Sequence, residues 1–135
     1  MDLNNAIAIS ASGMRAQSTR IRVVAENIAN ADSLGTNKGE DPYRRKTILF
    51  KNALDRDINA ELVKIGKIKF DRSPFKTVYE PHHPMADEKG YIQRPNVNSL
   101  IEMMDMREAQ RSYEANLGTI DTSRSMIQRT IDLLR

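Results

Sequence analysis

The chain has 135 residues, with 21 basic and 18 acidic side chains and a formal net charge of +3 at pH 7. It contains no cysteine or tryptophan, and aromatic residues make up only 5% of it. This composition excludes disulfides, thiolate metal sites and cysteine nucleophiles. The length allows one domain, or an elongated subunit with one insert, and the composition leaves little apolar surface with which to build an independent core.

Membrane and signal segments are not expected. Uninterrupted apolar runs such as Ala6–Ile9 are far shorter than the roughly 20 residues that span a bilayer, so we expect no direct membrane insertion. The start Met1-Asp2-Leu3 has neither a basic region nor a long apolar stretch, so no cleaved signal peptide is expected. By that test alone the protein would stay in the cytosol.

The charge and the prolines divide the chain into three segments: residues 1–35, 36–95 and 96–135. All eight lysines and all five prolines lie in the middle segment, which has a net charge of +4. The two end segments are nearly neutral and free of proline. Because proline disrupts helices, this pattern predicts two helical arms, 1–35 and 96–135, separated by a β and loop insert.

The N-terminal arm repeats apolar residues every seven positions, which predicts an amphipathic helix of about 30 residues. Asp2 is expected to cap its start, and Asn30 or Gly35 its end. One row of the heptad pattern contains Ile7, Met14, Ile21 and Ile28, and the companion row contains Leu3, Ser10, Gln17, Val24 and Ala31.

The middle segment has short alternating runs between turn residues, which predict a small sheet or hairpin. The candidate strands are Tyr43–Phe50, Lys67–Phe70, Thr77–Tyr79 and Tyr91–Gln93. Residues 52–64 have apolar spacings that also allow a short helix, and that alternative stays open. Residues 80–90 contain two prolines and a glycine and are expected to be extended and mobile.

The C-terminal arm resembles the N-terminal one and predicts a second long helix. Ser99-Leu-Ile-Glu102 has the pattern of a capping box at its start. The first heptad row contains Met106, Tyr113, Ile120, Ile127 and Leu134, and the companion row contains Met103, Gln110, Leu117, Arg124 and Ile131.

The expected fold class is mainly α with a small β insert (α+β), the two long terminal helices pairing as an antiparallel coiled-coil-like hairpin. Apolar residues such as Ile9, Leu100 and Ile101 lie outside that seam. Ordinary packing inside a small bundle would account for them. We favour the alternative that the arms pack against neighbouring copies or other subunits.

No catalytic, cofactor or metal site is predicted. The glycines form no phosphate-binding loop, and the adjacent His82 and His83 would point to opposite faces of an extended segment. We therefore expect that the protein is not an enzyme. The basic residues of the insert allow an alternative function, a small binding module for nucleic acid or peptidoglycan. A solvated strand face, whose charges discourage aggregation, explains them better.

Segments of the N-terminal arm resemble the bacterial flagellar rod and hook proteins. They are Ser10–Gln17 and Arg20–Asp32 with its Asn27-Ile-Ala-Asn-Ala31 core. Five further segments narrow the resemblance to the proximal rod subunits, and with them it extends over the whole chain: Pro42–Lys46, His83-Pro84, Gly90-Tyr91, Pro95–Asn98 and Glu102–Leu117. The similarity includes polar and turn residues in the same order as well as the apolar spacing. Two unrelated amphipathic helices would share only the apolar spacing.

This resemblance implies a structural subunit whose terminal helices build the inner layer of the rod. It implies as partners copies of the chain itself, other rod proteins and the flagellar type III export apparatus, with no nucleic acid and no cofactor. It also implies that the protein reaches the periplasmic rod without signal cleavage, which revises the cytosolic expectation. The residues expected to form the assembly interface are Ile7, Met14, Ile21, Val24, Asn27, Ile28, Asn30, Met106, Tyr113, Leu117, Ile120, Ile127, Ile131 and Leu134.

Overall fold

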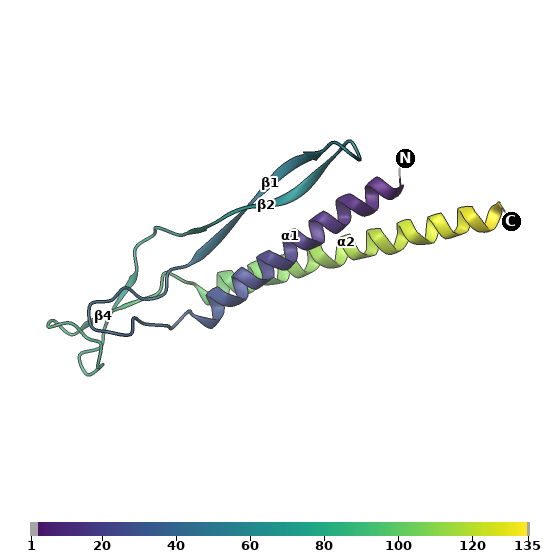
Figure 1. Ribbon diagram of the computed structural model, residues 1–135. Helices are drawn as coiled ribbons and strands as arrows, with labels where there is room; N and C mark the ends of the chain where they lie inside the picture. Colours follow the sequence, from purple (N-terminus) through teal and green to yellow (C-terminus); the bar gives the residue numbers. More distant parts are fainter. Residues whose placement is uncertain (1–2, 135) are drawn as a thin grey trace. The chain divides into compact units, whose positions relative to one another are not determined.

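A computed structural model describes residues 3–134 (Figure 1). Its elements are α1 (Leu3–Ala29), β1 (Lys46–Asp55), β2 (Ala60–Phe70), β3 (Lys76–Tyr79), β4 (Tyr91–Arg94) and α2 (Ser99–Leu133). The expected α+β class is confirmed. The expected cap at Asp2 lies outside the described residues.

The chain divides into two compact units. The first unit combines the chain up to Ile21 with Ile48–Lys67 and the chain from Met106 onward. The second unit combines Arg22–Thr47 with Ile68–Asp105. Each unit therefore takes a part of both helices.

In the first unit α1 has contacts on two sides (Figure 1). On the side of the β1–β2 hairpin, the Val63 amide donates to Ser12 Oγ at 3.1 Å and Asn5 Nδ2 donates to the Ile58 carbonyl at 3.1 Å. On the side of α2, a methyl group at Gly13 would stand 3.0 Å from Asn116 Nδ2. The two helices therefore approach closely at Gly13, where a larger side chain would meet Asn116.

Strands β1 and β2 pair with each other as a hairpin. The alternative of a short helix over residues 52–64 is therefore wrong. The reason lies in the turn between the strands: Asp55 Oδ1 accepts from the Asp57 amide at 3.0 Å, and Asn59 has a φ of 49°. Asp and Asn stabilise such turns and tolerate left-handed backbone, and this turn interrupts the helical spacing.

In the second unit β3 and β4 pair antiparallel, with Val78 opposite Ile92. The connection between them, residues 80–90, was expected to be extended but is folded into turns. Its backbone bonds include the Glu80 amide to the Gly90 carbonyl at 2.9 Å. Gly90 has a φ of +81°, and a methyl group there would stand 3.0 Å from Pro81 Cβ. Glycine is therefore required at this position.

The ends of the helices that belong to the second unit are fixed by asparagines. Asn30 ends α1 as expected, with its Nδ2 donating to the Glu26 carbonyl at 2.9 Å. The capping box at Ser99 is wrong: Asn98 caps α2 instead, because its Oδ1 accepts from the Leu100 amide at 3.1 Å. The Glu102 carboxylate does not turn back to the helix start, because it bonds to Asn27 and Arg45.

Two rows of α2 were expected to face inward. The structure confirms the first row from Met106 to Ile127, but the second inward row lies one residue earlier in the sequence than expected. Met106, Tyr113 and Ile127 are half-buried and Ile120 is buried, as the first row predicts. The companion row Met103, Gln110, Leu117, Arg124 and Ile131 is exposed throughout. In its place Glu102, Ala109, Asn116 and Ser123 are buried or half-buried. Small and polar residues allow close helix contact, a preference that the apolar period of the sequence does not reveal.

Candidate assembly surface

Large apolar side chains remain exposed along α2. Burial in water-excluding contacts is the favourable state for such groups, and a row of them on a helix indicates a surface that packs against something else. Leu117 is 42% exposed and Ile131 is 51% exposed. The exposed apolar residues of this helix, here called the α2 surface, are Leu100, Ile101, Met103, Met104, Leu117, Met126, Ile131, Leu133 and Leu134.

The last turns of α2 are the most exposed part of this surface. Every residue from 128 to 134 is exposed, and Leu133 and Leu134 reach 87% and 84%. A helix end that only faces water has no physical need for three large apolar residues within four positions. These turns therefore have the character of an unpartnered contact surface.

The structure separates the fourteen residues of the expected assembly interface into two groups. Leu117, Ile131 and Leu134 are exposed. The others are buried or half-buried within the chain: Ile7, Met14, Ile21, Val24, Asn27, Ile28, Asn30, Met106, Tyr113, Ile120 and Ile127. Only the exposed group is open to another chain in this conformation.

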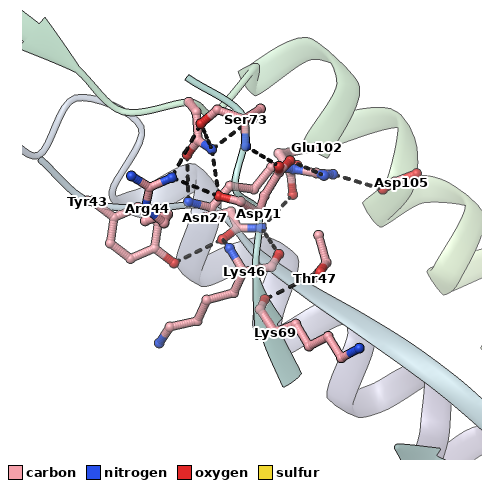
Figure 2. A network of polar contacts seen from close by, with 12 residues as sticks. Asn27, Tyr43, Arg44, Lys46, Thr47, Lys69, Asp71, Ser73, Glu102 and Asp105 are labelled. Atoms are coloured by element: carbon pink, nitrogen blue, oxygen red, sulfur yellow. Dashed lines mark hydrogen bonds and ion pairs between the residues drawn. The ribbon is translucent and has the colours of Figure 1, made fainter. Parts of the chain in front are cut away.

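A network of polar side chains lies in the second unit, where the end of α1 meets the start of α2 (Figure 2). We call it the junction network; its members are Asn27, Tyr43, Arg45, Lys46, Asp71, Asn96 and Glu102. Asn27, only 1% exposed, is its centre. Its Nδ2 donates to the Lys46 carbonyl at 2.8 Å and to Glu102 Oε2 at 3.0 Å.

The oxygen of the same amide is used as well. Asn27 Oδ1 accepts from the Tyr43 hydroxyl and from the Lys46 amide, both at 2.9 Å. The side chain thus bonds both the amide and the carbonyl of the first residue of β1, as a neighbouring strand would. Helix α1 is in this way joined to the start of the hairpin and to α2.

Glu102 is 1% exposed, and its charge is compensated by Arg45. Glu102 Oε1 accepts from Arg45 Nε at 2.5 Å, and the same guanidinium lies 3.5 Å from an Asp71 oxygen and 3.9 Å from Asp105. Asn96 Oδ1 accepts from the Arg45 amide at 2.8 Å. A carboxylate removed from water needs such a partner, since an unpaired buried charge is strongly unfavourable.

The environment of the network shifts three pKa values. Burial, together with the charges of Glu26 and Glu102, raises the pKa of Tyr43 to about 12. Burial alone would lower the pKa of Arg45, but the hydrogen bonds and charges of Glu102 and Asp71 outweigh it and raise that pKa. The backbone amide of Ser73, its hydroxyl and Arg45 lower the pKa of Asp71. At neutral pH, Arg45 and Asp71 therefore favour their ionised forms, and Tyr43 favours its neutral phenol.

The side chains of the basic cluster Arg44–Lys46 bind to other residues of the second unit. Arg44 donates to the Asp71 carbonyl at 3.1 Å and lies over the Phe75 ring at 4.1 Å. Lys46 pairs with Glu26 through its ammonium group. These three cations therefore do not form a free basic patch, and the binding-module alternative loses its strongest cluster.

Sequence reasoning missed the role of Arg45, Asp71, Asn96 and Glu102. The sequence predicts Glu102 in a capping box and Arg45 on a solvated strand face. No local signal links residues 27, 45 and 102, since their contact depends on the tertiary fold. The inward row of Ala109, Asn116 and Ser123 did have a signal, a seven-residue spacing of small or polar residues in the C-terminal arm.

Two further features of residues 3–134 bear on metal ions and on membranes. Residues 3–134 contain no group of three side chains placed to hold a metal ion. Neither helix of this part is long and apolar enough to cross a membrane.

Comparison with known proteins gives the family. Residues 7–36 match the family model described as flagella basal body rod protein, and residues 88–133 match the C-terminal model of the flagellar basal body rod FlgEFG proteins. The chain is 52% identical to the flagellar basal-body rod protein FlgC of Agrobacterium fabrum, over 98% of this chain and 96% of the relative.

More distant relatives align over the same length. The FlgC protein of Escherichia coli O6:H1 is 40% identical, with 98% of both chains covered. That of Borreliella burgdorferi is 37% identical, with 100% of this chain and 99% of the relative covered. Both the α2 surface and the junction network lie inside the length aligned with this last relative. The chain therefore belongs to the FlgC family of flagellar basal-body rod proteins.

Proposed function

We propose that this protein is a structural subunit of the proximal rod of the bacterial flagellar basal body, which assembles through its terminal helices. The observation that carries the proposal is the α2 surface, a set of large apolar side chains distributed around the helix that no described residue covers. Its family consists of structural rod proteins, and no enzymatic role is proposed. The partners are further copies of the chain and other rod proteins.

The two helices are proposed to pair as an antiparallel coiled-coil-like hairpin. Within the first unit, Gly13 lies against Asn116, and Arg20 lies 3.9 Å from Glu108. The residue number of the contact in α2 falls as the residue number in α1 rises, as an antiparallel pair requires. Seven-residue spacing of the inward residues of α2 supports the same arrangement.

The three segments are proposed to have different roles. The arms 1–35 and 96–135 form the helical layer of the rod, and the insert 36–95 supports them. In the expected interface, Leu117, Ile131 and Leu134 contact other subunits, while buried members such as Asn27 and Ile120 act by fixing the shape of the helix pair. This division follows from their exposure.

The route to the rod is proposed to be the flagellar type III export apparatus, without a cleaved signal peptide. The destination is then the periplasmic part of the basal body. A small chain with few apolar residues per charged residue is compatible with passage through a narrow channel in an incompletely folded state.

Two substitutions on one heptad row of α2 test the proposal. Leu117→Asp places a carboxylate where contact with another subunit is expected, and Gln110→Asp places the same group one heptad earlier at an exposed polar position. Both variants are introduced into cells that lack the wild-type chain. We expect Leu117→Asp to be made but missing from purified basal bodies, with loss of swimming, and Gln110→Asp to be incorporated.

The converse result contradicts the proposal. Incorporation of both variants with normal swimming would show that the α2 surface has no part in assembly. Absence of the wild-type chain from purified basal bodies, as judged by mass spectrometry, would contradict the proposed role as a rod subunit.

A further inference from the structure

A groove lies in the first unit between α1 and the β1–β2 hairpin. Its volume is about 520 Å³. Its apolar walls come from Ala8 and Ala16 of α1 and from Leu62, Val63 and Ile65 of β2. Small residues on the helix side leave the space open. Truncation of one large apolar side chain leaves about 150 Å³, enough for a benzene ring, so this groove has room for several apolar side chains.

The rim of the groove carries charge. Arg15, Lys64 and Asp55 line it, two cations and one anion. Arg15 and Lys64 are exposed. An occupant with an apolar row and an acidic residue beside it would match both the walls and the rim.

The end of α2 has these properties. Ile131 and Leu134 lie three positions apart, on one side of the helix. Asp132 follows Ile131 directly, Arg129 precedes it by two positions, and both are exposed. The segment therefore brings one anion and one cation to a rim of two cations and one anion. An amphipathic helix that enters a groove uses this spacing of apolar anchors.

The same end extends beyond its partner within the chain. With Gly13 against Asn116 and Arg20 facing Glu108, Leu3 at the start of α1 comes opposite a residue near 126. The last two turns of α2 therefore have no part of α1 beside them. Their exposure agrees with this register.

The end of α2 cannot fill the groove of its own chain. In this register the groove residue Ser12 comes opposite a position near 117, which is about 21 Å along the helix axis from Ile131 at 1.5 Å per residue. Helix α2 is continuous from Ser99 to Leu133, so its end does not fold back. The groove also opens on the hairpin side of α1, whereas Asn116 of α2 lies against Gly13.

We propose that the end of the C-terminal helix, residues 128–134, of one copy inserts into the α1–hairpin groove of a second copy. The inference rests on the proposed function, since it names the contact by which rod subunits join. Donor and acceptor are different surfaces of the same chain, so the contact is head-to-tail. Such a contact builds an open or ring-like assembly and leaves an unfilled groove at one end.

Cysteine cross-linking tests this contact, because the natural chain has no cysteine. The test variant combines Ile131→Cys with Leu62→Cys, and the control combines Ile131→Cys with Lys51→Cys, an exposed position of β1 outside the groove. Each is co-expressed with the wild-type chain so that rods form. Purified basal bodies are oxidised mildly and separated without reductant.

We expect disulfide-linked dimers and longer multimers of the test variant, at least about tenfold more abundant than with the control, because disulfides form only between closely placed cysteines. A ladder distinguishes the head-to-tail contact from a symmetric one, since symmetric pairing of Ile131 would give dimers in the single Ile131→Cys variant. A second pair, Leu134→Cys with Ile58→Cys, repeats the test where the first is poorly incorporated.

Three results would overturn the proposal: no multimers from either pair, dimers from Ile131→Cys alone, or a disulfide to a different rod protein. Each of these leaves the proposed function intact if the chain is found in the basal bodies. Absence of the wild-type chain from them would instead reject the proposed function, so the two failures are distinguishable.

Discussion

The two ends of α2 differ in how they meet their surroundings. In its first turn Glu102 is 1% exposed and bonds to Asn27 and Arg45, whereas the last two turns carry Ile131 and Leu134 with half or more of their surface in water. The first end is held by directional polar bonds within the chain. The last end exposes large apolar side chains, with the charged Asp132 beside them.

This difference separates folding from assembly. Hydrogen bonds to buried charged groups demand one geometry, so the junction network fixes how α1, the start of β1 and α2 meet. Apolar surface gains free energy from burial by any complementary partner, about 1.5 to 3 kcal/mol for each fully buried large side chain. Substitutions at the two ends should therefore act on different quantities.

Glu102→Ala should cause the largest loss of stability. It leaves Arg45 and the Asn27 amide without their partner in a site that excludes water, and we expect the free energy of unfolding to fall by about 3 kcal/mol. For a chain of this size that lowers the melting temperature by about 10 °C. Thermal unfolding followed by circular dichroism measures it.

The matched control is Glu108→Ala. Glu108 is exposed and stands 3.9 Å from Arg20, and pairs of this kind contribute about 0 to 1 kcal/mol. Equal melting temperatures for the two variants would mean that the junction network does not stabilise the fold.

Asn27→Leu should have the next largest effect. The leucine has a similar size but leaves the Lys46 amide and the Tyr43 hydroxyl without their bonds to Asn27 Oδ1, so we expect a loss of about 2 kcal/mol. Urea unfolding gives this value, with Asn52→Leu as the control at an exposed position of β1. A change no larger than that of the control would contradict the central place of Asn27.

Tyr43→Phe should cost about 1 kcal/mol at neutral pH, for one lost hydrogen bond to Asn27. Its signature is the pH dependence. The pKa of Tyr43 is raised to about 12 from 10.0, so the folded state favours the neutral phenol. That stabilisation is complete below pH 10 and is lost as the pH rises towards 12.

The measurement is the melting temperature of the wild type and of Tyr43→Phe from pH 8 to pH 11.5. We expect the advantage of the wild type to shrink above pH 10. A constant difference over this range would show that the phenol ionises as freely in the folded chain as in the unfolded one.

Ile131→Asp should have the smallest effect on the isolated chain, because the replaced side chain is already 51% exposed. We expect a change in unfolding free energy below about 0.5 kcal/mol. In the rod, however, the carboxylate would have to lose its water without a partner. The variant should be made and exported but missing from basal bodies, and the cells should not swim.

The Ile131→Asp variant separates the two roles of α2, because folding and assembly are measured on the same chain. A large fall in the melting temperature would mean that the end of α2 is part of the folded chain's own core. Normal incorporation into basal bodies would mean that it is not an assembly surface.

The sequence predicted those features that depend on local pattern. Heptad spacing predicted both helices and the inward row from Met106 to Ile127, and Asn30 was one of the two expected ends of α1, with Gly35. It did not predict the second inward row of α2, because apolar periodicity selects Leu117 and Ile131 over Ala109 and Ser123. It also left residues 52–64 open, where the Asp55–Asn59 turn decides for a hairpin.

What the sequence by itself determined is the class of fold, the two helical arms and their apolar spacing, since these follow from the period and the backbone preferences of neighbouring residues. Which apolar residues stay exposed was decided by the tertiary structure alone. That depends on helix register, and register is set by contacts between residues far apart in the chain, such as Gly13 with Asn116 and Asn27 with Glu102. A local pattern repeats along a helix and is compatible with several registers, whereas close contacts and buried hydrogen bonds are satisfied in one.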